Sequence, residues 1–219
     1  IGRIYPLVAL DDRITNALIV IGGASMVVGG LVALTRDVLK QVLAYSTISQ
    51  YGYVVVMFGI GGTYGVAGAT FYVIAHALAK SALFMTAGAV TESTHSNTLS
   101  EVGGLLRREP LLAVGSAMAS AGMMALPLTI GFFKDELFFA SSDTRGVWMQ
   151  VFAILGAALS FAYIGRFWKE IFLGPEKGDH APVPGRLNVP ILTLGLLVVA
   201  GGIWVEPFRD VAERAASVS

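Results

Sequence analysis

Long apolar stretches in which charged residues are rare occupy most of the sequence. Charged residues make up 14% of the chain, against about 25% in a typical soluble domain. A membrane-spanning helix needs roughly 20 mainly apolar residues, and none of these stretches shows the strict alternation of a barrel strand. The sequence therefore predicts an all-α, polytopic membrane helix bundle with about six transmembrane helices, at residues 14–34, 44–61, 65–90, 111–141, 147–172 and 189–205.

Composition and connections exclude several other classes of protein. The 15 basic and 15 acidic residues cancel, which leaves no basic surface for nucleic acid. The chain has no cysteine and no soluble-enzyme motif, and His95 and His180 lie in separate loops. The sequence therefore predicts no metal, no cofactor and no redox or hydrolytic site. The connections are short, so residues 1–219 are predicted to form a single transmembrane domain. Because the chain starts at Ile1 without a signal peptide, we expect it to be cut from a longer protein.

Three polar residues share one face of the predicted helix 65–90. Tyr72, His76 and Lys80 are spaced four residues apart, so they form a stripe about 12 Å long in an otherwise apolar helix. Histidine titrates near neutral pH, and desolvation favours the neutral form of a buried lysine, which can then release its proton. The stripe has the geometry of a proton relay. The alternative is a core histidine beside a lysine that pairs with a carboxylate on another helix.

The predicted span 111–141 is too long for one plain helix and contains a break signal. Pro127 lacks a backbone N–H and clashes with the preceding turn, and Gly131 follows four residues later. In membranes a broken helix is tolerated where protein or water satisfies the freed backbone groups, as at the ion sites of transporters. The alternative is that the span ends at Phe133 and that the charges after it cap it at the surface. We assign these three adjacent charges to the ion pathway: Lys134, Asp135 and Glu136.

The remaining basic residues indicate how the bundle is oriented. The connections that follow residues 34, 90 and 172 hold slightly more basic residues than the other connections. Because cytoplasmic connections carry an excess of lysine and arginine, we expect these three connections to lie in the cytoplasm. Lys40 opens the span 44–61 and is a candidate proton uptake group, with a cytoplasmic anchor as the alternative that we favour. Arg166 is interpreted as an interfacial, structural residue.

Three segments resemble signatures of one membrane-protein family. Residues 36–61, RDVLKQVLAYSTISQYGYVVVMFGIG, resemble the family signature D-[LI]-K-R-[LV]-L-A-Y-S-T-[IVM]-S-Q-[LI]-G. Residues 71–90 look like its F-H-L-x-x-H-A-x-x-K-A-L-L-F-L-x-x-G helix, and residues 125–139 look like its L-P-x-x-x-G-F-x-S-K-[DE] broken helix. These signatures belong to the antiporter-like membrane subunits of NADH–quinone oxidoreductase, membrane-bound hydrogenases and Mrp-type Na+/H+ antiporters. The resemblance spans residues 14–172.

The resemblance implies roles for individual residues. His76 and Lys80 match the second histidine and the lysine of the family's helix, and Tyr72 stands where the family often has its first histidine. Lys134 or Asp135 stands at the lysine of the broken helix, and we favour Lys134 as the terminal proton carrier. The resemblance also implies that the chain is the C-terminal half of a longer subunit built from two inverted repeats.

The implied function is proton or cation translocation within a multisubunit complex. The short connection 94–110 and the segment ALPL at residues 125–128 favour an Mrp-type Na+/H+ antiporter subunit or a hydrogenase relative. The alternatives are a proton-pumping subunit of NADH–quinone oxidoreductase and a structural anchor without its own ion path. The implied partners are other integral membrane subunits, the lipid bilayer, protons and, as a second candidate ion, Na+. The implied location is the prokaryotic cell (inner) membrane.

Overall fold

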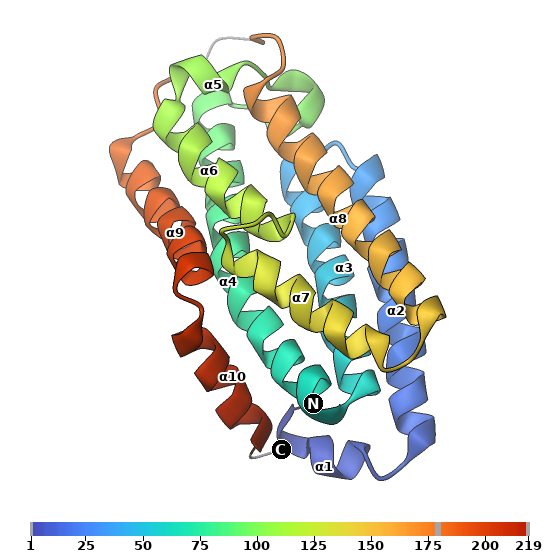
Figure 1. Ribbon diagram of the computed structural model, residues 1–219. Helices are drawn as coiled ribbons and strands as arrows, with labels where there is room; N and C mark the ends of the chain where they lie inside the picture. Colours follow the sequence, from blue (N-terminus) through green and yellow to red (C-terminus); the bar gives the residue numbers. More distant parts are fainter. Residues whose placement is uncertain (1, 178–180, 218–219) are drawn as a thin grey trace.

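The computed structural model describes residues 2–177 and 181–217, so His180 lies outside the described residues. In this part of the chain all regular elements are helices (Figure 1). They are η1 Gly2–Ile4, α1 Tyr5–Val8, α2 Asp12–Thr35, α3 Leu39–Ile60, α4 Gly62–Thr94, η2 Leu99–Glu101, α5 Leu105–Arg108, α6 Pro110–Met123, α7 Ile130–Asp143, α8 Val147–Phe172, α9 Gly185–Ile203 and α10 Glu206–Ser217. The predicted all-α class is confirmed.

Several of the described helices are suited to crossing a membrane. By length and composition, α2, α4 over Tyr64–Thr94, α8 and α9 are each long and apolar enough. α3 has 22 residues, which span about 33 Å, but its polar side chains make it less apolar. α6 and α7, with 14 residues each, follow one another along a further path through the bundle (Figure 1). The predicted polytopic bundle is therefore confirmed, and the chain is an integral membrane protein.

α3 begins earlier than the sequence indicates. It starts at Leu39 rather than near residue 44, so Lys40 lies in its first turn. The backbone just before it pairs with the connection after α4: Leu39 N donates to the Asn97 carbonyl oxygen at 2.8 Å, and Leu99 N donates to the Asp37 carbonyl oxygen at 2.8 Å. These bonds hold the first turn of α3 at the end of the bundle.

Small residues bring α2 and α3 close together. A Cβ atom built on Gly52 of α3 would lie 2.5 Å from the carbonyl oxygen of Gly22 in α2. Ser49 Oγ donates a hydrogen bond of 2.8 Å to the carbonyl oxygen of Met26. Because lipid is as apolar as the helix surface, helices in membranes associate through such close packing and interhelical hydrogen bonds. This contact fixes the depth of α3, which carries part of the candidate site.

The long stretch 111–141 is interrupted, as predicted. The connection 124–129 separates α6 from α7 and contains Pro127. Ala125 and Leu128 adopt φ values of +57° and +68°, a conformation that costs about 1–3 kcal/mol in a residue other than glycine. Strain of this kind persists only where the surrounding structure enforces it, and it clusters at functional sites.

Gly131 is the second residue of the helix that follows this break. It lies in the first turn of α7, which begins at Ile130. A Cβ atom on Gly131 would overlap the carbonyl oxygen of Gly122, near the end of α6. The glycine is thus required for the close approach of the two half-helices rather than for the bend.

Replacing Gly131 with alanine is expected to destabilise the bundle by roughly 1–3 kcal/mol, because the added methyl group has no room against Gly122. Thermal unfolding of the protein in detergent measures the change. The matched control is Gly88→Ala in α4, where nothing lies within 4 Å of the added atom. There, loss of a glycine from a helix interior is expected to stabilise by about 0.5–1 kcal/mol. If Gly131→Ala and Gly88→Ala were equally stable, Gly131 would not lie in close contact with Gly122.

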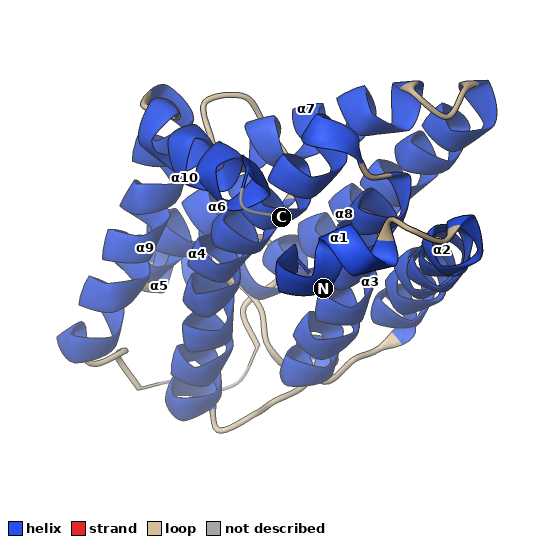
Figure 2. Ribbon diagram, turned by 90° about the horizontal axis from the view of Figure 1, so that it is seen from below, coloured by secondary structure: helices blue, strands red, loops and turns tan. Residues whose placement is uncertain are grey.

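α4 is the helix around which the others are arranged. It packs against α3, α6, α7, α9 and α10. In Figure 1, α7 and α10 lie beside the lower half of α4, and α6 and α9 lie beside its upper half. Figure 2, seen from below, shows α1 and α10 at the end of the bundle that faces the viewer. Side chains on α4 can therefore meet partners from α3 and α7 inside the bundle.

Candidate functional site

The polar stripe of α4 faces the interior of the bundle. Tyr72, His76 and Lys80 are 0%, 4% and 5% exposed. The spacing on α4 places them on one face, and the packing of α3 and α7 against α4 covers that face. The three groups therefore lie in protein rather than in lipid.

Lys80 reaches across to α3. Its Nζ donates a hydrogen bond to Ser46 Oγ, which in turn donates to the carbonyl oxygen of Leu43 at 2.9 Å. Within residues 2–177 and 181–217, no carboxylate forms an ion pair with Lys80. The alternative of a structural ion pair therefore finds no support. A hydroxyl group can accept from an ammonium and donate to a neutral amine, so this partner suits a lysine that changes its protonation state.

His76 lies between Lys80 and Tyr72 along α4. Neither of its ring nitrogens has a hydrogen-bond partner in the described part of the chain. Tyr51 of α3, which is 44% exposed, contacts the imidazole edge-on with ring centroids 5.4 Å apart. Buried polar groups are nearly always hydrogen-bonded to protein or to ordered water. The imidazole thus has free donor and acceptor capacity for water, as a relay group requires.

Lys134 and Asp135, near the start of α7, join the stripe at Tyr72. Lys134 is 1% exposed, and its Nζ lies 2.6 Å from Asp135 Oδ1 and 3.3 Å from Tyr72 Oη. The same ammonium lies 4.4 Å from the centre of the Tyr72 ring. These two charges are buried in the bundle, so they do not cap the span at its surface.

Hydroxyl and amide groups that were not singled out from the sequence continue this network across α3 and α8. Tyr72 Oη donates to Gln50 Oε1 at 2.6 Å. Gln50 Nε2 donates to Ser160 Oγ and to Tyr163 Oη, at 2.8 Å each. Tyr53 Oη lies 3.1 Å from Ser160 Oγ. All five side chains are buried, so they form one polar layer in the middle of the bundle.

A spacing signal for this layer is present in the sequence. Ser46, Gln50 and Tyr53 stand at positions i, i+4 and i+7, which share one face of α3. Ser160 and Tyr163 stand at i and i+3 on α8. A polar face in an otherwise apolar span is the same pattern that identified the stripe on α4.

Glu136 and Lys40 lie apart from the buried network. The side chain of Glu136 is 49% exposed and pairs with Arg209 Nη2 of α10 at 3.6 Å. Lys40 is exposed in the first turn of α3, at the opposite end of the bundle from α10 (Figure 1). Arg166 donates to the carbonyl oxygens of Leu34 and Arg36 at 2.8 Å each, which is a structural role at the helix ends.

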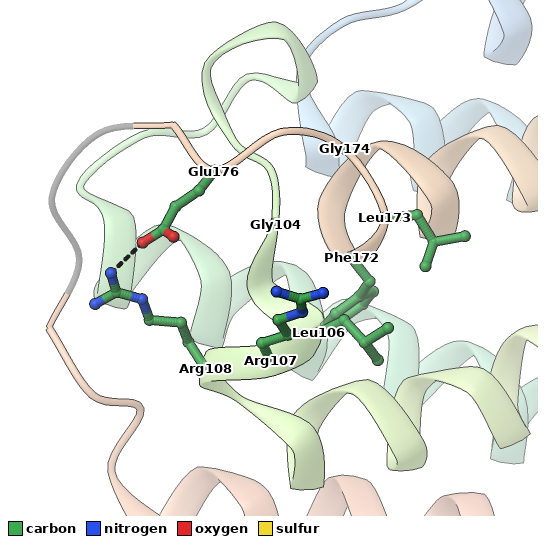
Figure 3. A pocket seen from close by; sticks show the side chains of 8 residues that line it. All are labelled: Gly104, Leu106, Arg107, Arg108, Phe172, Leu173, Gly174 and Glu176. Atoms are coloured by element: carbon green, nitrogen blue, oxygen red, sulfur yellow. Dashed lines mark ion pairs between the residues drawn. The ribbon is translucent and has the colours of Figure 1, made fainter.

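The cavity at the α5 end of the bundle lies away from the polar network. It has a volume of about 630 Å³ (Figure 3). Arg107 and Leu173 line it, and Arg108 pairs with Glu176 at its edge. Among the described residues, no group of three or more histidine, aspartate or glutamate side chains is placed to hold a metal ion.

The buried network can pass protons from group to group. Tyr72, Lys134 and Asp135 are in direct hydrogen-bond contact. The stripe from Tyr72 to Lys80 is about 12 Å long, so its steps through His76 require bridging water, since proton transfer needs hydrogen-bond contact or one intervening water. The arrangement is therefore a chain of groups that can donate and accept protons.

The chain is similar to membrane subunits of several known complexes. Residues 1–160 match the family described as NADH:quinone oxidoreductase/Mrp antiporter, TM. The chain is 31% identical, over 98% of its length, to F(420)H(2) dehydrogenase subunit N of Methanosarcina mazei, of which it covers 46%. It is 29% identical, over 93% of its length, to Na(+)/H(+) antiporter subunit A1 of Staphylococcus saprophyticus, of which it covers 29%.

A solved structure has the same fold. The Mrp complex from Dietzia sp. DQ12-45-1b contains a chain that matches with a TM-score of 0.88 and 20% identity, covering 94% of this chain and 47% of that one. The chain therefore spans about half the length, or less, of the proteins that it matches.

Proposed function

This chain belongs to the NADH:quinone oxidoreductase/Mrp antiporter transmembrane family, and we propose that it carries protons or cations through the membrane as part of a longer subunit. It is an integral protein of a prokaryotic cell membrane. The proposed partners are other integral membrane subunits of a multisubunit complex. The proposed cargo is protons, with Na+ as a second candidate ion.

Lys80 carries this proposal. A lysine at the centre of a membrane helix costs at least about 2.5–3.5 kcal/mol on insertion scales. Lys80 is 5% exposed and is held by a hydroxyl group rather than by a carboxylate. A structural anchor gains nothing from such a residue. A translocating subunit needs a buried group that binds and releases protons.

Each group of the network has a proposed role. Lys80 is the central proton carrier, and His76 links it through water to Tyr72. Tyr72 positions Lys134 and passes protons to it, and Lys134 with Asp135 forms the terminal carrier. Lys40, exposed at the aqueous end of α3, is the candidate uptake group, and a cytoplasmic anchor is the alternative role that we favour for it.

The finer proposal is Mrp-type Na+/H+ antiport, with redox-driven proton pumping as the alternative. Everted membrane vesicles that contain the full-length complex distinguish the two. For an antiporter, NaCl added to acidified vesicles releases protons, and vesicles without the complex show no release. For a pump, an electron donor together with quinone acidifies the vesicles and NaCl has no effect. A complex that gives neither response would be an anchor.

His76→Ala is expected to slow translocation by about tenfold, equivalent to about 1.4 kcal/mol in the barrier, and therefore less than loss of Lys80 does. The reason is that no described protein group forms a hydrogen bond with the imidazole, so water can take its place in the chain of proton-transferring groups. Initial rates of proton release from vesicles measure the effect. A defect as large as that of Lys80→Ala would mean that the imidazole is itself indispensable.

A further inference from the structure

α10 is a charged helix that packs against the side of the bundle at its α1 end (Figure 1). Arg209 pairs with Glu136 and lies 5.8 Å from the ring of Phe133, and both partners belong to the first half of α7. α7 then continues to Asp143, about 10 Å further along its axis. α10 therefore lies beside the lower half of α4, and its Arg209 reaches the first half of α7 (Figure 1). Charged side chains beside membrane-spanning helices are stable where they face protein, water or a water-filled cavity.

A pocket lies between α4, α7 and α10. It has a volume of about 400 Å³, which is room for several water molecules, and its walls carry both acidic and basic groups. Tyr64 of α4, Glu136 and Ala140 of α7, and Arg209 and Glu213 of α10 line it. Two carboxylates against one guanidinium make this pocket a better environment for cations than for anions.

The pocket begins where the buried network ends. Asp135, whose carboxylate holds Lys134, is 6% exposed, and the next residue, Glu136, lines the pocket. Consecutive residues of a helix point about 100° apart. α7 thus presents one carboxylate to the network and the next one to the pocket, within a single turn.

We propose that this pocket is the water-filled outlet of the proton pathway, and that the Glu136–Arg209 ion pair latches α10 over it. A proton that leaves the Lys134–Asp135 pair passes to water or to the carboxylate of Glu136, and from there to the aqueous phase at the end of the bundle opposite Lys40. This inference rests on the proposed function, because an outlet requires a pathway that leads to it.

Cysteine accessibility tests the outlet, because the chain itself has no cysteine. Ala140→Cys places a thiol in the pocket wall, and Ala77→Cys places one on the outward surface of α4 as a matched control. A membrane-impermeant cationic methanethiosulfonate is added to the full-length complex from the outer side of the membrane. The charges of the connections place the Lys40 end of the bundle in the cytoplasm, so the α10 end faces this outer side. We expect Ala140→Cys to react at least about tenfold faster than Ala77→Cys, because only a hydrated thiol ionises to the reactive thiolate. The attached cation should also block translocation.

The latch is tested by Arg209→Gln in the Ala140→Cys background. Loss of the ion pair should speed labelling by about two- to fivefold, the change that an exposed ion pair can supply. Arg214→Gln, an exposed residue near the end of α10, is the control and should leave the labelling rate unchanged. If Ala140→Cys is labelled at the same rate with and without Arg209→Gln, the ion pair does not hold α10 over the pocket.

The two proposals fail in different ways. Suppose that Lys80→Ala has lost translocation, but that Ala140→Cys either reacts as slowly as Ala77→Cys or is labelled without loss of translocation. The proposal that the pocket is the outlet is then wrong, and the proposed function stands. Lipid or a partner subunit would then cover the pocket. If Lys80→Ala still translocates ions, the proposed function is wrong whatever the labelling shows.

Discussion

Vesicles that contain the Lys80→Ala complex are expected to lose translocation by at least about 100-fold, the scale of a lost proton-transfer group, while the complex still assembles. Ser46, the hydrogen-bond partner of Lys80, does not titrate near neutral pH and cannot take over the proton. Assembly survives because removal of Lys80 leaves no opposite charge stranded among the described residues. Proton release from vesicles and size-exclusion chromatography of the solubilised complex measure the two effects.

Two further lysine variants sharpen this result. Lys80→Arg should be as inactive as Lys80→Ala, because arginine keeps its charge and cannot release its proton. Lys169→Ala removes an exposed lysine near the end of α8 and should leave translocation unchanged. Near-normal rates in an assembled Lys80→Ala complex would remove the stripe from the pathway.

The stripe and the break follow from local rules. Residues four apart on one helix share a face whatever the helix packs against, so Tyr72, His76 and Lys80 could be grouped from the sequence. Pro127 interrupts a helix because of its own covalent structure. These features require no knowledge of neighbouring helices, and the helical bundle is confirmed with an interruption at that proline.

The remaining parts of the site depend on packing between distant segments. Ser46 and Gln50 become partners of Lys80 and Tyr72 only because glycines set the depth of α3, and that depth does not appear in a local pattern. Gly131 is explained by its contact with Gly122 on the other half-helix. Such contacts join residues that no helical period connects.

Glu136 shows a further limit of sequence patterns. Lys134, Asp135 and Glu136 are adjacent in sequence, so all three could be assigned to one pathway. On a helix they point in different directions, and only packing decides which direction is inward. The structure places the first two inside the bundle, and it places Glu136 against Arg209 of α10. α10 itself lies beyond the last predicted span, 189–205, and no element was predicted there.

Replacing Lys134 or Asp135 is expected to affect stability as well as translocation, unlike replacing Lys80. Lys134→Met is expected to destabilise the complex by about 3–5 kcal/mol, because it leaves Asp135 buried without a counter-charge. Asp135→Leu should destabilise it similarly, because it strands the ammonium. Both single variants should also lose translocation. Thermal unfolding and proton release, measured on the same detergent-solubilised or reconstituted complex, separate the two effects.

The double variant Lys134→Met with Asp135→Leu separates stability from transport. Replacing both members of a buried ion pair with apolar residues of similar size removes two desolvation penalties at once, and is often neutral or stabilising. We therefore expect the double variant to recover stability to within about 1 kcal/mol of the unmodified complex, while translocation stays lost because no terminal proton carrier remains. Translocation that returns together with stability would mean that the pair only supports the fold. The pathway would then end at Tyr72, and the pocket beneath α10 could not be its outlet.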